Sequence, residues 1–179
     1  MSYYSIKALT WGCLLALAVA FLPLHAAQAA KPKPLIKNPA AWGAFSLKEA
    51  KGLACYLAAQ PDLSLPKSAR RGDIWFMVTH RPKLQINHDV SIMLGYPLKK
   101  GKLVTIVVDK KRKFRLMSDG DTAWTREKKD NIQLVRALSR GSSMVVSGVS
   151  SRGTKTTDKY SLKGFTAAHR AINKACKIK

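Results

Sequence analysis

Alternating apolar and polar positions predict a series of short β-strands, and the region from residue 104 to 116 gives the clearest signal. Val104, Ile106 and Val108 recur at every second position, and residues 113–116 return with polar–apolar alternation after a basic stretch at 110–112. A period of two is typical of a strand with one buried face. The pattern predicts a β-hairpin with lysine and arginine at its tip.

Other segments show similar strand patterns and are separated by turn signals, among them the Gly95-Tyr96-Pro97 sequence and the polar loop 150–154. These predicted strands are residues 53–57, 74–79, 90–94, 144–147 and 158–162. Two segments have helical spacing instead. The first is residues 130–140, with Asp130 as the expected N-cap, and the second is residues 165–176.

About seven short strands with two helices, one internal and one C-terminal, predict an all-β chain. The expected architecture is an antiparallel β-sandwich, and a small closed barrel is the alternative. The sequence shows no internal repeat and no alternation of strands with helices, so a parallel α/β sheet is not expected.

The first 29 residues have the pattern of a secretory signal peptide. Lys7 precedes an apolar stretch from Ala8 to Leu24, and Ala27-Gln28-Ala29 matches the small-residue site that signal peptidase cleaves. The alternative is an uncleaved anchor helix, although Pro23 interrupts the end of the apolar stretch. We therefore expect a cleaved signal at 1–29, a flexible, basic, proline-rich leader at 30–41, and a single domain at 42–179 in the periplasm or cell envelope.

Two cysteines, Cys55 and Cys176, remain after the predicted cleavage. Each falls on an apolar face, Cys55 in a predicted strand and Cys176 four residues after Ile172 in the predicted C-terminal helix. Because exported proteins fold in an oxidising compartment, we expect a Cys55–Cys176 disulfide, with two buried free thiols as the alternative.

The chain has 179 residues with 32 Lys+Arg and 10 Asp+Glu, a formal net charge of +22. Cleavage would remove only Lys7 among the charged residues and leave +21. Such an excess predicts salt-sensitive attraction to anionic lipid head groups, envelope polysaccharide or a host surface, including peripheral membrane contact. Export makes nucleic acid the least expected of the anionic partners.

The predicted hairpin tip is the main candidate for contact with an anion. It carries Lys110, Lys111, Arg112 and Lys113, and its only acidic neighbour is Asp109. At the other end of the hairpin, Lys100 and Lys102 are expected to lie opposite Asp119 and Asp121, which would pair with them. These lysine–aspartate pairs would leave the tip as the uncompensated end.

No catalytic, metal or cofactor site is predicted. Ser64 and Lys67 have the Ser-x-x-Lys spacing of some acyl-transfer enzymes, but Pro66 favours a loop rather than the helix start that this chemistry uses. The histidines at 80, 88 and 169 lack the spacing of a metal-binding motif, and surface or capping roles are expected for them. The Asp119-Gly120-Asp121 turn lacks the longer ligand series of a calcium loop.

A series of motifs resembles the invasion-associated locus B family, in the same order along the chain. The motifs are Val90-Ser91-Ile92, Gly95-Tyr96-Pro97, Gly120-Asp121, Ala123-Trp124, Ser150-Ser151-Arg152-Gly153-Thr154 and Tyr160-Ser161-Leu162-Lys163-Gly164-Phe165. The resemblance spans nearly all of residues 42–176, and the last two motifs are the most specific.

The resemblance implies a bacterial exported protein with an immunoglobulin-like β-sandwich, in a family named for a role in host-cell invasion. It supplies no catalytic residues. Within the motifs, Tyr160 and Trp124 are expected to anchor the core, and Arg152 is expected to contact a carboxylate or phosphate from an exposed loop. We expect a non-enzymatic envelope protein that binds an anionic partner, and the alternative is a hydrolase or other enzyme acting on envelope material through an unrecognised site.

Overall fold

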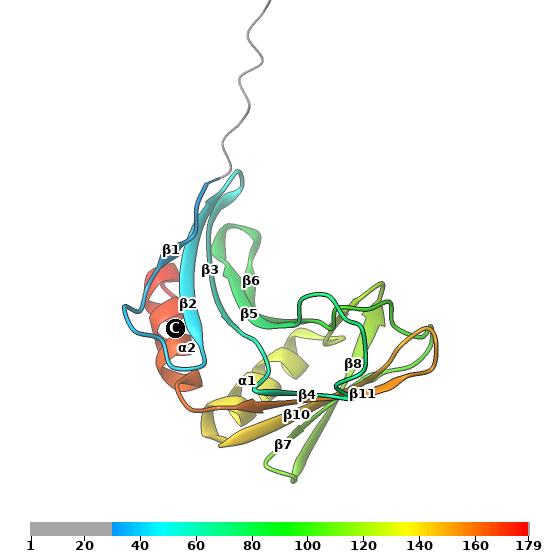
Figure 1. Cartoon of the computed structure of the whole chain (residues 1–179). Helices are drawn as coiled ribbons and strands as arrows, with labels where there is room; N and C mark the ends of the chain where they lie inside the picture. Colours follow the sequence, from blue (N-terminus) through cyan, green and yellow to red (C-terminus); the bar gives the residue numbers. More distant parts are fainter. Residues whose placement is uncertain (1–29, 179) are drawn as a thin grey trace, which may run out of the picture.

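Eleven strands and two α-helices make up the described part of the chain, residues 30–178 of a computed structural model (Figure 1). The predicted signal peptide at 1–29 lies outside the described residues. The strands are β1 (Lys33–Pro34), β2 (Gly43–Glu49), β3 (Gly52–Ala59), β4 (Leu63–Leu65), β5 (Trp75–Arg81), β6 (Ile86–Met93), β7 (Val104–Val108), β8 (Arg112–Asp119), β9 (Thr122–Trp124), β10 (Ser143–Val149) and β11 (Lys155–Ser161). The helices are α1 (Lys128–Arg140) and α2 (Phe165–Cys176), and a short 3₁₀ helix spans Pro82–Leu84.

The strands form one continuous antiparallel sheet in the order β1-β2-β3-β5-β6-β9-β8-β7-β10-β11-β4. The all-β prediction is therefore confirmed. Strand β8 connects the two halves, because residues 112–116 pair with β7 whereas residues 117–119 pair with β9. Strands that pass from one layer to another in this way form the corners of packed sheets. Figure 1 shows the resulting bend between the β2–β3–β5 half and the β7–β10–β11 half.

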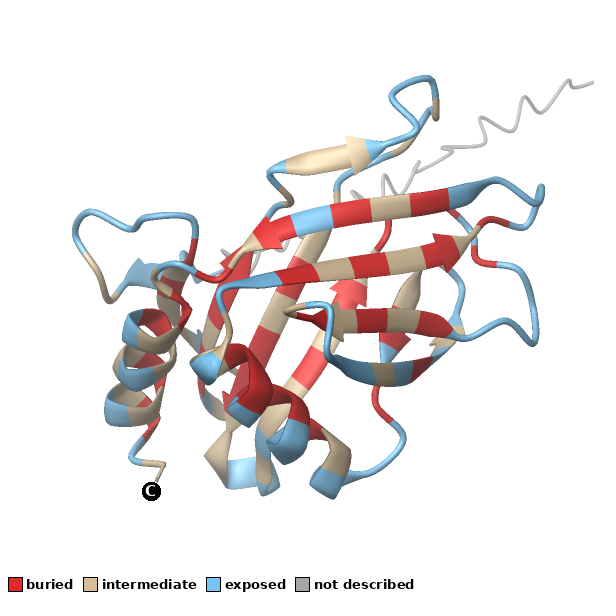
Figure 2. Cartoon of the chain, turned by 90° about the horizontal axis from the view of Figure 1, so that it is seen from below, coloured by how far each residue is buried: buried red, intermediate tan, exposed pale blue. Residues whose placement is uncertain are grey.

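The two halves of the sheet meet in a shared core, as the layers of a sandwich do. Trp42, just before β2, lies with its ring centroid 5.6 Å from Phe76 of β5, 6.3 Å from Tyr160 of β11 and 5.0 Å from Phe165 of α2. Its indole Nε1–H donates to the carbonyl oxygen of Ser161 at 2.8 Å. Figure 2 shows buried positions alternating along the strands and lining one side of each helix.

Of the two residues expected to anchor the core, the prediction is correct for Tyr160 and wrong for Trp124. Tyr160 is buried, although its hydroxyl has no hydrogen-bond partner in the described structure, but Trp124 is 37% exposed. Trp124 belongs to the three-residue strand β9, in which only Ala123 points into the core. Trp42 takes the anchoring role instead. The sequence offered no strand pattern there, because Trp42 precedes its strand.

Helix α2 occupies the predicted residues, and the Cys55–Cys176 disulfide is present, with the two Cα atoms 6.0 Å apart. Gly164 precedes the helix at a φ of 94°, a left-handed conformation that glycine adopts without steric cost. Phe165, Ala168 and Ile172 share the buried face with Cys176. This face packs on β2 and β3, so the disulfide joins the last turn of α2 to the centre of the first half-sheet.

Helix α1 begins two residues before the predicted cap. Its N-cap is Glu127, without a side-chain capping bond, so the prediction for Asp130 is wrong. Asp130 lies in the first turn, where a negative charge still favours the positive end of the helix dipole. Asn131 accepts a hydrogen bond from the Val90 N–H at 2.9 Å. This bond attaches α1 to β6 at a position that the short strand β9 does not reach.

Four strands were not anticipated. Strand β1 places Lys33 and Pro34 of the expected flexible leader beside Ser46 and Phe45 of β2, so part of the leader belongs to the sheet. Strands β1, β4 and β9 have three residues or fewer, which is too short to show a period. Strand β2, in contrast, begins with a glycine and carries few buried side chains.

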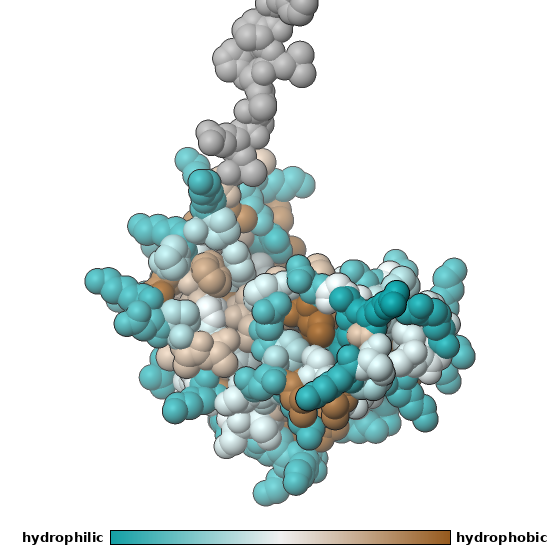
Figure 3. All heavy atoms as spheres, in the orientation of Figure 1, coloured by the Kyte–Doolittle hydropathy of each residue, from teal (hydrophilic) through white to brown (hydrophobic). Residues whose placement is uncertain are grey.

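Within the described residues, no helix combines the length and apolar character needed to cross a lipid bilayer. Hydrophilic side chains cover most of the face in Figure 3, with small hydrophobic patches between them. This hydrophilic face fits a sequence in which charged residues make up 23% of the chain.

Candidate functional site

The basic hairpin tip forms as predicted, between β7 and β8. Asp109 and Lys110 have φ values of 48° and 56°, and the Lys111 N–H donates to the Val108 carbonyl at 3.0 Å to close the turn. Two successive residues with positive φ are typical of tight hairpin turns whose twist matches the flanking strands. The tip residues Lys110, Lys111, Arg112 and Lys113 are all exposed.

The carboxylate of Asp109 does not pair with these cations. It accepts the backbone N–H groups of Ser143 and Ser142, both at 2.9 Å, and these bonds are the main reason that its pKa lies below the usual value. Its charge is therefore directed at the loop before β10. No ion pair within 4 Å joins a tip cation to any described carboxylate.

The predicted lysine–aspartate pairs at the other end of the hairpin are wrong. Asp119 accepts the Gly120 N–H at 3.0 Å, and Asp121 accepts the Thr122 hydroxyl at 3.0 Å. Neither forms an ion pair with Lys100 or Lys102. The register does bring these groups to the same end of the hairpin, but short aspartate side chains bond to their own turn more readily than to mobile lysines.

A groove between the hairpin and helix α1 gathers four cations. Its volume is about 380 Å³, and it is lined by Arg112, Lys113, Phe114, Gln133, Arg136 and Arg140. We call these the basic groove. All four cationic side chains are exposed, and no carboxylate lines the groove.

The spacing along α1 explains why this helix contributes to the basic groove. Gln133, Arg136 and Arg140 lie three and four residues apart and so share one side of the helix. Leu134 and Leu138 occupy the buried side. The sequence analysis did not identify either arginine as a binding residue. Their side of α1 is predictable from the sequence, but its position beside β8 is not.

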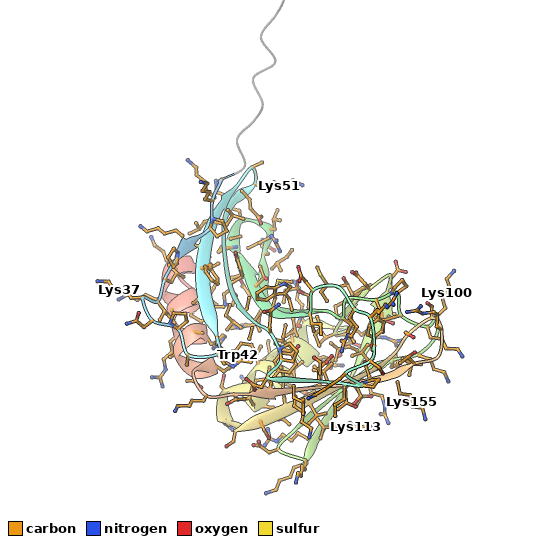
Figure 4. The ribbon with its side chains drawn as sticks, viewed as in Figure 1. Lys37, Trp42, Lys51, Lys100, Lys113 and Lys155 are labelled. Carbon is orange, nitrogen blue, oxygen red and sulfur yellow. A yellow bond between two sulfur atoms is a disulfide. The ribbon has the colours of Figure 1, made fainter. Side chains whose placement is uncertain are left out.

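Arg152 belongs to a different site. It lies in the loop after β10, whereas the hairpin tip bonds to the residues before β10, so the two are separated by the length of that strand, roughly 20 Å. Figure 4 labels Lys113 of β8 and Lys155 of β11 on this half of the sheet. The sequence-predicted residues Lys110–Lys113 and Arg152 therefore do not form one surface.

The Arg152 loop borders a second basic opening of about 300 Å³. Arg70 and Arg71 line it with Arg152, together with the side chains of Ser68, Ser150 and Thr154. Only two of these arginines are free to bind an anion. Arg71 is already paired with Asp158 and lies over the ring of Tyr96, with 5.0 Å between its Cζ and the ring centroid.

The sequence analysis missed the Arg71–Asp158 pair. Two guanidinium nitrogens of Arg71 donate to the carboxylate at 2.6 and 2.7 Å, and the side chains are 6% and 1% exposed. The pattern in β11 could have predicted a buried carboxylate, because Asp158 alternates with Thr156 and Tyr160 on the buried face. A carboxylate on an inward face needs a buried cationic partner.

The three histidines are brought together, contrary to the expected surface and capping roles. His80 ends on the buried face of β5, His88 lies in β6 and His169 in α2, and one ring nitrogen of each lies within 4.8 Å of the others. Burial lowers the pKa of His80 and of His169 to about 4. Burial, with the nearby charge of Arg136, also lowers the pKa of His88. The imidazoles are therefore neutral at neutral pH.

Ser64 and Lys67 do not form a catalytic pair. Ser64 lies in the middle of the short strand β4, and Lys67 is exposed beyond the turn at Pro66. The helix start on which such a serine–lysine pair depends is absent at these residues. Pro66 favoured a loop here, but the structure places Ser64 in strand β4.

Comparison with solved structures finds the crystal structure of invasion associated protein B from Bartonella henselae. The two chains have 13% sequence identity and a TM-score of 0.55, and the match covers 79% of this chain and 96% of that chain. At this identity the match establishes a similar fold. Comparison with curated proteins finds no match.

The comparison with protein families agrees with the motif resemblance. Residues 42–173 match the family described as the invasion associated locus B (IalB) protein. The match covers most of the chain, including both half-sheets and most of helix α2. The protein therefore belongs to the invasion associated locus B family.

Proposed function

We propose that this protein is a non-enzymatic component of the periplasm or cell envelope that binds an anionic partner through the basic groove. The partner is an anionic envelope component, either lipid head groups or polysaccharide, or an anionic host surface. The observation that carries the proposal is the convergence of Arg112, Lys113, Arg136 and Arg140 on one groove that no carboxylate lines.

The physical argument rests on uncompensated charge. Four cations that share a groove repel one another, and an anion placed among them relieves this repulsion. Three of the four are arginines, whose planar guanidinium groups bind phosphate or carboxylate through paired hydrogen bonds. Because the groups are exposed, the attraction is screened by salt, and affinity should fall steeply as ionic strength rises.

The envelope location is supported by two features. The N-terminal sequence has the pattern of a secretory signal, and the fold contains a Cys55–Cys176 disulfide, which is typical of proteins that fold outside the reducing cytosol. A role in host invasion is a second candidate, favoured by the family's name. Detection of the folded protein on the outer cell surface would separate this role from a purely periplasmic one.

The enzymatic alternative is a hydrolase acting on envelope material. A pocket that joined a histidine or Ser64 to a carboxylate would favour it. The cavity beside His88 and His169 is lined by no carboxylate. Ser64 lies opposite Asp158 in the pairing of β4 with β11, but that carboxylate is already paired with Arg71. These observations support a binding function.

The proposal is tested by measuring binding at about 50 mM and about 500 mM salt, a change that shortens the Debye length roughly three-fold. The probes are vesicles with phosphatidylglycerol, vesicles with only zwitterionic lipid, and heparin as a sulfated polysaccharide. We expect binding to an anionic probe that is lost at high salt, and the probe that binds identifies the partner class. Salt-independent binding, or no binding to either anionic probe, would show that the proposal is wrong. Release of sugar fragments during incubation would favour the hydrolase.

A further inference from the structure

The cluster of His80, His88 and His169 has the composition of a transition-metal site and is not used by the proposed anion binding. Its three residues come from β5, β6 and α2, and they are 8 and 81 positions apart along the chain. Sequence spacing could not reveal such a cluster, because metal motifs depend on ligands that are close in sequence. The antiparallel pairing of β5 with β6 and the docking of α2 bring the residues together.

The hydrogen bonds of His80 fix its tautomer. Its Nδ1 accepts the backbone N–H of His88 at 3.0 Å, so the proton of the neutral ring is on Nε2, which donates to Oδ1 of Asn173 at 2.8 Å. An imidazole whose second nitrogen donates to an amide or carboxyl oxygen is the usual arrangement around a metal-binding histidine. His80 is thus oriented by Asn173, and its Nδ1 lone pair is directed toward His88.

His88 and His169 contact each other directly through ring nitrogens. Nδ1 of His88 and Nε2 of His169 are 3.2 Å apart. Two lone pairs at this distance repel, so the contact requires a proton or a metal ion between the rings. Two nitrogens that bind one tetrahedral zinc ion at 2.0–2.1 Å are separated by about 3.3–3.4 Å, close to the observed spacing.

The cluster also opens to space in which a ligand or water can complete the coordination. A cavity of about 390 Å³ adjoins His88, His169 and Asn173. Arg136 and Arg140 line the same cavity from α1, and they would disfavour a bare cation. An anion bound in the cavity, beside both the metal and these arginines, would offset their repulsion.

We propose that His80, His88 and His169 form a binding site for a divalent transition metal of the zinc and copper class. His88 Nδ1 and His169 Nε2 are the first two ligands, and His80 Nδ1 becomes the third when it exchanges the His88 N–H for the metal. Imidazole ligands suit these metals, and they leave the remaining position of a tetrahedral site open to the cavity.

The disulfide supports the cluster from both sides. Cys55 lies opposite His80 in the pairing of β3 with β5, and Cys176 ends the helix that carries His169 and Asn173. The site is therefore complete only when α2 is docked on the sheet. We expect the Cys55→Ser/Cys176→Ser variant to bind metal more weakly than the oxidised protein.

The test is a titration of the exported protein, purified without a polyhistidine tag and stripped with a chelator, with Co²⁺ and then Zn²⁺. Cobalt absorption in the visible range reports the coordination number, and calorimetry gives the stoichiometry. We expect about one metal ion per chain, with tetrahedral cobalt absorption that zinc displaces. Every histidine after residue 29 belongs to the cluster, so the matched control is Asn87→Ala, an exposed neighbour of His88 in β6, which should bind metal as the unmodified protein does.

His88→Ala and His169→Ala each remove a first ligand and should abolish the cobalt spectrum. Asn173→Ala removes only the group that orients His80 and should weaken metal binding roughly ten- to hundred-fold. Circular dichroism of each variant checks that the fold is retained. The proposal is overturned if the unmodified protein binds no metal, as a simple His88–His169 hydrogen bond would require. It is also overturned if His169→Ala, folded, binds metal as tightly as Asn87→Ala.

Discussion

Arg71 and Asp158 form a buried ion pair that joins the loop before β5 to strand β11. Arg71 also donates from Nε and from one terminal nitrogen to the carbonyl oxygen of Leu94, at 3.1 and 2.9 Å. One guanidinium group therefore connects three segments: the loop that contains it, the residue after β6, and β11, the last strand along the chain. This pair underlies the opening beside Arg152.

We predict that Arg71→Met lowers the free energy of unfolding by about 3–5 kcal/mol, because it leaves the Asp158 carboxylate buried without a partner. The double variant Arg71→Met/Asp158→Leu should recover much of this loss, since no unpaired charge remains. Urea unfolding of the four proteins in this cycle measures both effects. If the loss of stability in the double variant equals the sum of the two single losses, the two side chains act independently and the prediction is wrong.

Gly95 and Gly153 both have positive φ values, 72° and 90°, but different surroundings. A Cβ at Gly95 would collide with the backbone carbonyl of Gly72, whereas a Cβ at Gly153 would meet nothing within 4 Å. We predict that Gly153→Ala costs only about 1–2 kcal/mol for its left-handed backbone. Gly95→Ala should cost clearly more and should displace the neighbouring loop that holds Arg71. Thermal unfolding of the two variants gives the comparison, and equal losses would contradict it.

Removal of the disulfide should destabilise the protein mainly at helix α2. The cysteines are 121 residues apart, and closing a loop of this length stabilises by at most about 4–5 kcal/mol on chain-entropy grounds. For Cys55→Ser/Cys176→Ser we expect a loss up to this size, with faster hydrogen exchange in α2 than in β10. If exchange rises uniformly, the disulfide does not act as a local clamp on the helix.

The ion pair between Glu49 of β2 and Arg81 of β5 makes a pH-dependent contribution to the free energy of unfolding. The hydrogen bond from Arg81 is the main cause that lowers the pKa of Glu49 below its usual 4.5. The ionised form is thus favoured by folding, so the contribution is complete above pH 4.5 and is lost as pH falls below it. We predict that Glu49→Gln costs well under about 1 kcal/mol at neutral pH, since the pair is partly exposed.

The difference between Glu49→Gln and the unmodified protein should shrink as the pH of urea unfolding approaches about 3. Asp73→Asn is the matched control, because the Asp73 side chain is exposed and takes part in no described ion pair, so its removal should have no measurable effect. A Glu49→Gln effect that grows in acid would mean that the sign of the linkage is wrong.

Local patterns in the sequence were sufficient to predict several elements of the structure. The hairpin at 104–116 has an unbroken period of two, and α2 has four buried positions on one helical face, so both appear where they were predicted. The disulfide followed from the presence of two cysteines on apolar faces. Each of these features depends on residues whose spacing is itself the evidence.

The basic groove and the histidine cluster could not be predicted, because they depend on how distant elements pack together, which sequence spacing does not show. Arg136 and Arg140 are ordinary exposed helix residues until α1 docks beside β8, and the histidines are unremarkable until α2 packs on β5. The pairing of Asp119 and Asp121 with lysines failed because the aspartates satisfied their own turns. Opposite charges at one end of a hairpin are a weak guide when local backbone donors compete for the carboxylates.

The most direct test of the account compares two variants that each lose four positive charges. The groove variant carries Arg112→Gln, Lys113→Gln, Arg136→Gln and Arg140→Gln, and the control carries Lys99→Gln, Lys100→Gln, Lys102→Gln and Lys155→Gln. All eight side chains are exposed and belong to no described ion pair, so the control matches the net charge.

Binding to the anionic probe is measured at about 50 mM salt, where screening is weak, after thermal unfolding has shown that both variants are folded. The account predicts that the groove variant loses at least about ten-fold more affinity than the control, which corresponds to roughly 1.4 kcal/mol. Equal losses would show that only net charge matters, and a larger loss in the control would place the binding surface at the opposite end of the hairpin.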